Sequence, residues 1–343
     1  AHAGGLGKVR NDECGFLLPF PKGCPRKPSV CGVAHPRRTR VRLAVCALHP
    51  LPLRGNGHHE KTVNTFLPSM EINALLATPV ALPCMPRTVA LLMNALAPAE
   101  PNLRRVNQLF CIDPGLSARL LEQANSATFQ APGQIVGVPE ALALLGTAQL
   151  RALVAAAPLG AASRTVPGVN LPQFWRYSLN TAKMARSLAG FVHHNQIAAY
   201  TAGLLHGLGE VVLHLVDTDK AQSVDTLVPP FDPRRAKIEQ RIFGYCYAQV
   251  SAAMAQRWQL PEVVVDALRY LSAPFDNDVY EPLAGVLHLA AWRARAREIG
   301  WGEKELAVSF PGEVGLALGL DIDMVLQQDP IDWTARPDAG DYV

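Results

Sequence analysis

The chain has 343 residues, of which 49% are hydrophobic and only 7% are aromatic. Alanine and leucine dominate the apolar set, which favours a packed helical protein over a β-sandwich built from valine, threonine and aromatic residues. The most apolar stretch, residues 196–216, is interrupted by His206, Glu210 and His214. The sequence therefore predicts a soluble cytoplasmic protein without a membrane-spanning segment.

The formal net charge of +3 combines two unlike segments. Residues 1–69 contain 11 Lys/Arg and 3 Asp/Glu and carry +8, whereas the remaining residues contain 21 Lys/Arg and 26 Asp/Glu and carry −5. A folded body with a negative balance does not favour nucleic-acid binding. We therefore expect no nucleic-acid partner for the part of the chain after residue 69.

Residues 1–69 also differ in composition from the rest. They hold 8 Pro, 8 Gly, 5 of the 10 His and 4 of the 7 Cys, without a sustained helical period. A basic functional arm is one interpretation. A metal site is another, and it would use a set that lacks a Cys-x-x-Cys pair: Cys14, Cys24, Cys31 and His35.

Two further interpretations of this segment concern processing. An internal signal peptide in "RRTRVRLAVCALHPLPL" is interrupted by His49 and Pro50. The favoured interpretation is upstream sequence translated ahead of a natural start at Met70, the first methionine of the chain. We accordingly expect residues 70–343 to fold and function alone.

Residues 70–165 predict a first helical lobe. "MPRTVALLMNAL" and "IDPGLSARLLEQANSA" each place a proline in the first helical turn, and Asp113 is a candidate N-cap of the second helix. "PEALALLGTAQLRALVAAA" predicts two helices hinged at Gly146. The Pro- and Gly-rich stretch at 163–173 predicts the boundary of this lobe.

Residues 166–300 predict a second helical lobe, followed by a tail at 301–343 with two or three short helices. The expected helices include one from Pro172 to about Val192, a pair interrupted near 207–209, and a long one from about Tyr280 to Gly300. A further helix is expected to carry Pro261 in its first turn. No stretch alternates as a strand would, so the predicted class is an all-α, two-lobed helical bundle.

The order and wording of these elements resemble the HDOD family, bacterial signalling modules related to HD-type metal phosphohydrolases. In the first lobe the resemblance rests on "DPGLSARLLEQANSATF", "PEALALLG" and "LRALV". In the second it rests on "FWRYSLNTAKMAR", "AGLLHGLGEVVL", "IFGYCYAQVSAAMAQRWQLPE" and "HLAAWRA". It implies an all-helical fold with an HD-type second lobe and a regulatory role.

The resemblance also implies where a metal site would lie in a catalytic relative. Its early histidine matches Tyr177, its His-Asp pair matches His206 and Gly207, and its lysine matches Glu210. A later histidine matches Tyr247, and a histidine pair aligns with Leu271 and Ser272, just after Tyr270. Only His206 survives, so the resemblance implies a degenerate metal site without a bound metal or other cofactor.

The chemistry of the replacements supports that implication. A neutral tyrosine is a poor ligand for a divalent metal, and glycine offers no side chain. We therefore expect a vestigial pocket lined by six residues: Tyr177, His206, Gly207, Glu210, Tyr247 and Tyr270. His206 is expected to be a buried histidine with satisfied hydrogen bonds. Glu210 is expected in a surface ion pair, with a pair to a nearby Arg or His or a helix-capping role left open.

Other motifs indicate structure rather than chemistry. "HGLGE" lacks a dinucleotide-binding pattern, and no Walker-type run is present. The basic runs "RRVNQLF" and "DPRRAKIEQR" are expected to be solvated faces. His193 and His194 are expected at a helix end. Three isolated thiols are expected to be buried or indifferent: Cys84, Cys111 and Cys246.

Two hypotheses for function follow. The favoured one is a non-catalytic signal-transduction module that acts through contacts with an unidentified signalling protein, with self-association kept open. The alternative is a small-ligand sensor that binds a nucleotide or another anion in the vestigial pocket. An active phosphohydrolase is disfavoured because most metal ligands are missing. The sequence does not name the partner, the pathway or the oligomeric state.

Overall fold

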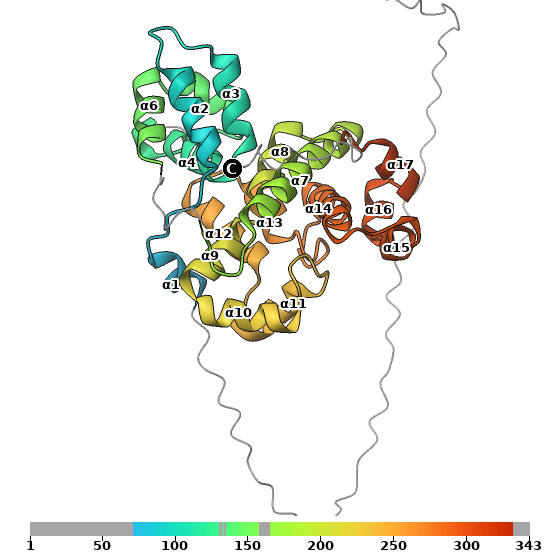
Figure 1. The fold of residues 1–343 in the computed structure, drawn as a ribbon. Helices are drawn as coiled ribbons and strands as arrows, with labels where there is room; N and C mark the ends of the chain where they lie inside the picture. Colours follow the sequence, from blue (N-terminus) through green and yellow to red (C-terminus); the bar gives the residue numbers. More distant parts are fainter. Residues whose placement is uncertain (1–70, 130–132, 134, 158–164, 332–343) are drawn as a thin grey trace, which may run out of the picture. The chain divides into compact units, whose positions relative to one another are not determined.

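The computed structural model describes residues 71–129, 133, 135–157 and 165–331 (Figure 1). The predictions about residues 1–69 and about a start at Met70 lie outside these residues, as do residues 163–164 of the predicted lobe boundary and the tail beyond residue 331. The structure does not test the predictions for these residues.

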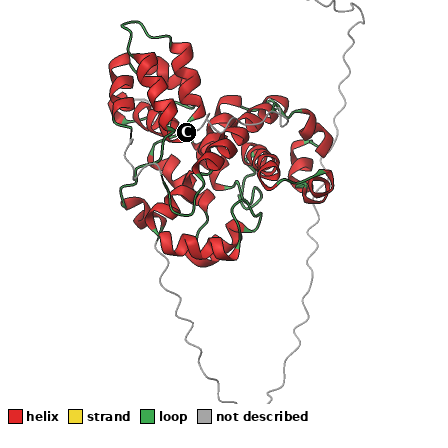
Figure 2. Cartoon of the chain, in the orientation of Figure 1, coloured by secondary structure: helices red, strands yellow, loops and turns green. Residues whose placement is uncertain are grey.

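The described chain is helical throughout (Figure 2). Its only pairing of extended backbone in the described residues is an isolated bridge between Val166 and Val169. The helices, with the short 3-10 turn η1, are α1 (Ile72–Ala77), α2 (Pro86–Leu96), α3 (Leu103–Ile112), α4 (Pro114–Ala124), η1 (Ala127–Phe129), α5 (Val138–Leu144), α6 (Thr147–Ala155), α7 (Leu171–Phe191), α8 (Gln196–Leu205), α9 (Leu208–Val216), α10 (Thr218–Leu227), α11 (Arg235–Phe243), α12 (Tyr247–Arg257), α13 (Glu262–Arg269), α14 (Pro282–Ile299), α15 (Glu303–Ser309), α16 (Gly312–Leu318) and α17 (Ile322–Gln327). The all-α prediction is confirmed.

Helix boundaries follow the capping residues of the sequence. Asn102, Asp113, Asn170 and Asn195 each accept a backbone N–H at the start of the next helix, as N-cap side chains do. Gly146 separates α5 from α6, as predicted. The predicted break near 207–209 and the long C-terminal helix of the second lobe are likewise present as α8, α9 and α14.

One local prediction needs correction, whereas the position of His193 and His194 at a helix end is confirmed. Pro261 is the N-cap of α13 rather than part of its first turn, because its ψ of 141° is extended. His193 and His194 follow the end of α7, and the contact with that end comes from their backbone. The N–H of His193 donates to the carbonyl of Gly190, and the N–H of His194 donates to that of Ala189.

Helices α2 to α6 pack around one another and around a buried carboxylate. Asp113 is fully buried between α3 and α4, and its two oxygens accept the backbone N–H groups of Leu116 at 3.0 Å and Met85 at 2.7 Å. The side chain thereby caps α4 and also fixes the chain that enters α2. Burial raises the pKa of Asp113 to about 6, against the lowering effect of these hydrogen bonds.

Helices α7 to α14 form a second set of packed helices, with α7 against α8 and α14, and α12 against α9 and α13. Close approach requires glycine at one of these crossings. A Cβ on Gly209 would lie 2.0 Å from the carbonyl oxygen of Tyr247 and 2.8 Å from the nitrogen of Ser251. The Gly209 N–H donates to the Ser251 hydroxyl, which in turn donates to the carbonyl of His206. The Ser251 side chain of α12 therefore links the start of α9 to the end of α8.

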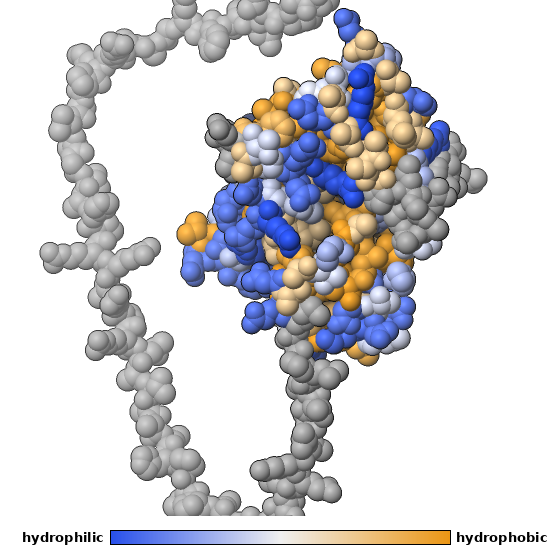
Figure 3. Space-filling model, turned by 90° about the vertical axis from the view of Figure 1, so that its left-hand side faces the viewer, coloured by the Kyte–Doolittle hydropathy of each residue, from blue (hydrophilic) through white to orange (hydrophobic). Residues whose placement is uncertain are grey.

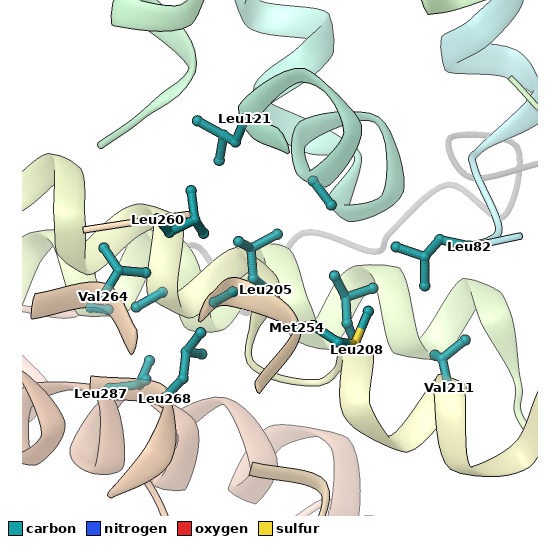
Figure 4. Packing of buried hydrophobic residues seen from close by; sticks show 14 of the residues in the cluster. Leu82, Leu121, Leu205, Leu208, Val211, Met254, Leu260, Val264, Leu268 and Leu287 are labelled. Carbon is teal, nitrogen blue, oxygen red and sulfur yellow. The ribbon is translucent and has the colours of Figure 1, made fainter. Parts of the chain in front are cut away.

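The two sets of helices share one hydrophobic core. Figure 4 shows Leu121 of α4 facing Leu205 of α8 and Leu260 after α12. The phenol of Tyr200 donates to the carbonyl of Cys111 at 2.9 Å, which joins α8 to the end of α3. Helix α1, included in the predicted first lobe, packs on α12 of the second set. The predicted lobe limits of 70–165 and 166–300 stay a prediction.

The apolar stretch 196–216 corresponds to α8 and α9, and it is the one described helical stretch with the length and hydropathy of a membrane span. A pair of bent helices, α5 and α6, passes the same test only if counted together. Within 196–216, 78% of the apolar window is buried inside the protein, which is typical of a core helix. Figure 3 views the molecule from the side of α1 and α6, where hydrophobic residues (orange) lie beside hydrophilic ones (blue).

Candidate functional site

A cavity of about 600 Å³ opens between α7, α9, α11, α12, the end of α13, and α14. Five of the six residues predicted for the vestigial pocket line it: Tyr177, Gly207, Glu210, Tyr247 and Tyr270. They come from four separate places in the chain, since Gly207 and Glu210 both lie at the start of α9. The sixth, His206, is fully buried and is not among the lining residues. The structure thus brings the predicted set together, but His206 lies in the protein interior rather than at the cavity surface.

Tyr177 separates His206 from the cavity. The two rings meet edge to face with their centroids 4.8 Å apart, and the ring of Phe231 meets Tyr177 in the same way at 4.9 Å. Phe231 adopts a φ of +67°, a conformation that side chains other than glycine rarely adopt. The wall is therefore a packed aromatic contact rather than an open coordination site.

His206 caps the C-terminal end of α8 and is only half satisfied. Its Nδ1 lies 2.7 Å from the carbonyl of Gly203, so this nitrogen carries the proton and donates. Its Nε2 has no hydrogen-bond partner among the described residues. The expectation of a satisfied histidine is wrong for Nε2. Burial lowers the pKa of His206 to about 4, because the charged ring would be cut off from water.

Gly207 has no room for the carboxylate of a catalytic relative. A Cβ at this position would lie 2.9 Å from Cε2 of Phe174, a ring in the hydrophobic core. The hydroxyl of Ser178 is 3.7 Å from the same point. The core of α7 has therefore closed over the place where an aspartate would project.

Glu210 forms an ion pair, although not on the surface as expected. Its carboxylate lies 3.2 Å from Nε of Arg235, whose side chain is only 4% exposed. The same guanidinium contacts Asp225 at 2.8 Å and Glu239 at 3.1 Å. One buried cation therefore faces three carboxylates. Burial and the charge of Glu210 raise the pKa of Glu239 to about 8, while Arg235 opposes that rise.

His214 extends this ion-pair network. Its Nδ1 lies 2.8 Å from the carbonyl of Glu210, and its Nε2 lies 3.1 Å from a carboxylate oxygen of Asp225. Both neighbours are acceptors, so the ring can donate to the carbonyl of Glu210 or to the carboxylate of Asp225. Glu239 also accepts the N–H of Tyr247 at 2.7 Å. The network thus ties α9, α10, α11 and the start of α12 together at one side of the cavity.

Arg295 of α14 is the residue of this cavity that sequence reasoning missed. It lines the cavity, is partly buried and hydrogen-bonds the phenol of Tyr177. His288, Ala291 and Arg295 all line the cavity at helical spacing on one face of α14. The spacing of the polar residues His288 and Arg295 on this face is the signal in the sequence that could have indicated them. It is diluted because Arg293 and Arg297 flank Arg295 in the same run.

Leu271 and Ser272, which align with a histidine pair of catalytic relatives, also line the cavity. The carbonyl of Leu271 lies 2.8 Å from Nδ1 of His288, which fixes this ring against the loop. Burial lowers the pKa of His288. His288 is thus a second histidine beside the cavity, reached from α14 rather than from the expected segment.

The donors around the cavity do not fit an HD-type metal centre. No group of three or more His, Cys, Asp or Glu side chains in the described part of the chain could hold a metal ion. The unpartnered Nε2 of His206 is behind Tyr177, and Glu210 is held by Arg235. Burial raises the pKa of both the Tyr177 and the Tyr247 phenols, which disfavours phenolate ligands.

The three isolated thiols occupy structural positions. All are free, with Cys84 and Cys246 buried and Cys111 partly buried. Burial raises the pKa of each thiol, that of Cys111 to about 11. A protonated, buried thiol is a poor nucleophile. Cys246 lines the cavity as the N-cap of α12, and its thiol contacts the Ser272 hydroxyl.

An all-helical domain that has this cavity, but lacks the metal-binding side chains of an HD-type centre, corresponds to a known class of proteins. The sequence profile of the HDOD domain matches residues 82–274, more than half of the chain. The chain therefore belongs to the HDOD domain family, which is related to HD phosphohydrolases.

Similar proteins share this fold at low sequence identity. The crystal structure of the MmoQ response regulator from Methylococcus capsulatus is 22% identical, with a TM-score of 0.55 over 66% of this chain and 97% of that one. A virulence factor from Campylobacter jejuni is 20% identical, with a TM-score of 0.55 over 76% and 94% of the two chains. These likenesses concern the fold.

A curated relative is an uncharacterized protein of Treponema pallidum. It is 26% identical over 218 residues, which cover 61% of this chain and 41% of the relative. The present chain therefore matches less than half of that protein's length.

Proposed function

We propose that this chain is a non-catalytic, metal-independent regulatory module of bacterial signal transduction, acting in the cytoplasm through contacts with another protein. The observation that carries the proposal is the state of the cavity. Where catalytic relatives hold metal ligands, this chain has an aromatic wall at Tyr177, a glycine facing Phe174 and a carboxylate neutralised by Arg235. The helical scaffold persists without that chemistry.

Membership of the HDOD family supports a signalling role, and one structure with the same fold is named a response regulator. The shared core offers a route for a signal. Tyr200 joins α8 to the end of α3, and α8 ends at His206 beside the cavity wall. A partner that moves α2 to α6 would therefore act on the helix that carries this wall.

Catalysis and metal content provide the first test. Purified protein should contain well below one equivalent of zinc, iron or manganese by elemental analysis. It should release no phosphate from phosphomonoesters and cleave no cyclic dinucleotide when these metals are added. Gly207→Asp should remain inactive, because Phe174 fills the space and further ligands are absent. Stoichiometric metal or metal-dependent turnover in the unmodified protein would refute the non-catalytic role.

Partner capture provides the second test. Tagged full-length chain should co-purify with a signalling protein in a stoichiometric complex from cells in which it is native, and size-exclusion chromatography with light scattering should give the composition. A chain that stays monomeric and captures no stoichiometric partner under any tested growth condition would count against action through protein contacts.

A further inference from the structure

We propose that the cavity binds a small phosphorylated molecule without a metal ion, and that Arg295 is the cation that anchors the phosphate. This inference goes beyond the regulatory role proposed above and makes the ligand-sensing alternative specific. It rests on charges and contacts around the cavity, so it can fail while the contact-based role stands, and the reverse also holds.

Arg295 is a cation without a direct ion pair, although the charge of Glu210 also acts on it. No carboxylate in the described part of the chain forms an ion pair with its guanidinium, although the side chain is partly buried and lines the cavity. Its one neutral anchor is the phenol oxygen of Tyr177. A guanidinium has five N–H donors, and withdrawing such a group from water without an anionic partner is costly. The remaining donors therefore suit an anion inside the cavity.

Helix α11 adds two more cations to the cavity lining. Lys237 and Arg241 lie one helical turn apart on α11, both line the cavity and both are exposed. Neither forms an ion pair with any described carboxylate. A ligand in the cavity would thus meet positive charge from both α11 and α14.

The acidic residues of the cavity do not cancel this charge. Glu210 is held by Arg235, and Asp232 is held by Arg234 at 2.7 Å. The third lining carboxylate, Asp276, is exposed in the loop after α13. Asp276 offsets one of the three lining cations without an ion pair, so a positive excess remains on the set Lys237, Arg241 and Arg295. A dianion with several oxygens, such as a phosphate monoester, matches this arrangement better than a single carboxylate.

Tyr177 can complete the anchor. Its phenol oxygen accepts from Arg295, which leaves the O–H free to donate to a ligand oxygen. The cavity volume of about 600 Å³ is within the range of small-molecule sites and holds more than a phosphate ion. Phe231 and Tyr270 line it as well and offer apolar ring surface to the rest of the molecule. A nucleotide-sized phosphorylated compound fits these features.

Titration calorimetry on the full chain tests the proposal. The probes are inorganic phosphate, AMP, GMP, adenosine and acetate, in a phosphate-free buffer that contains EDTA. We expect saturable binding of phosphate and of the two nucleotides, the nucleotides binding more tightly, and no binding of acetate. Absence of saturable binding by every phosphorylated probe, preference for acetate, or binding that requires an added metal would overturn the proposal.

Variants assign the anchor. Arg295→Met keeps the length of the side chain and should weaken nucleotide binding roughly 10- to 100-fold, because charge-assisted hydrogen bonds are lost. Arg104→Gln is the matched control: it removes one positive charge from an exposed side chain of α3 that does not line the cavity, so affinity should be unchanged. Equal affinity of Arg295→Met and the unmodified protein would overturn the role of Arg295.

A second variant, with substitutions in exposed cavity-lining residues of α11, tests the phosphate site if Arg295→Met does not fold. Lys237→Gln combined with Arg241→Gln changes only exposed side chains and should preserve the thermal melting temperature. Nucleotide affinity should fall several-fold, with a weaker dependence on salt concentration. Unchanged affinity and salt dependence in this double variant would contradict a phosphate site that uses both α11 and α14.

Discussion

Buried polar groups serve different purposes in the two sets of helices. In the first set, Asp113 is fully enclosed and both of its oxygens accept backbone N–H groups. Around the cavity of the second set, Arg235 faces three carboxylates and Nε2 of His206 has no partner among the described residues. The buried carboxylate of the first set therefore acts as a helix cap with both of its oxygens hydrogen-bonded. The cavity of the second set also contains polar groups that are not required to cap or join its helices.

The largest expected effect comes from Arg235, because its loss would leave carboxylates buried without a cation. Arg235→Ala should lower the free energy of unfolding by about 3–5 kcal/mol in urea denaturation at pH 7. Removal of this cation raises the folded-state pKa of Glu239 further above the unfolded value. Below about pH 8 Glu239 is protonated in both folded proteins, and above it only the wild type keeps a cation beside the ionised carboxylate, so the defect should be larger at pH 9 than at pH 6.

The neighbouring residue supplies the control for this prediction. Arg234 has a side chain that is 71% exposed and pairs with Asp232 at 2.7 Å. Arg234→Ala should have a far smaller effect than Arg235→Ala, since exposed ion pairs contribute little. Equal effects of the two substitutions would show that the buried network does not hold α9, α10 and α11 together.

The cap in the first set should give the next largest effect. Asp113→Ala removes the helix cap of α4 and leaves the buried N–H of Met85 unpaired, so we expect a loss of about 2–4 kcal/mol. Asp113→Asn keeps one acceptor, so its free energy of unfolding should lie between those of the wild type and Asp113→Ala. Asn102→Ala, at the exposed cap of α3, should cost about 1 kcal/mol. Urea denaturation of the three variants gives the comparison, and an Asp113→Ala protein as stable as the wild type would contradict it.

Helix boundaries could be predicted from the sequence more directly than the cavity residues could, and the reason is physical. Asp113 before Pro114, Gly146 between two apolar runs and the long helix α14 are local signals, and each determined an element directly. Four cavity residues came from family resemblance at matched spacing: Tyr177, Gly207, Glu210 and Tyr247. No hydrophobic or capping pattern marks them, because they meet only in the folded chain.

The buried ion pairs could not be predicted from the sequence. In "DPRRAKIEQR", Arg234 and Arg235 are adjacent and chemically identical, and this run was expected to be a solvated face. The structure leaves Arg234 71% exposed and Arg235 4% exposed. The difference arises from the packing of α10 and α9 against one side of α11, which no feature within the run encodes.

A further predicted effect depends on pH and isolates His206. Burial lowers its pKa to about 4, below the value of about 6.5 in an unfolded chain. Between these values the unfolded chain binds more protons, so the contribution of His206 to stability is present above pH 6.5 and is lost as pH falls toward 4. At pH 5 the loss should reach about 2 kcal/mol, at about 1.4 kcal/mol per unit. His206→Gln cannot titrate and should lack this loss.

The measurement is the difference in unfolding free energy between wild type and His206→Gln at pH 7.5 and at pH 5. Asp113 and Glu239 have raised pKa values and contribute in the opposite direction, but they do so equally in both proteins and cancel in the difference. His193→Gln, at an exposed histidine after α7, should leave the pH dependence unchanged. If the wild type keeps the same advantage or deficit at both pH values, the ring of His206 accepts a proton in the folded state, and the wall formed by Tyr177 does not seal it from water.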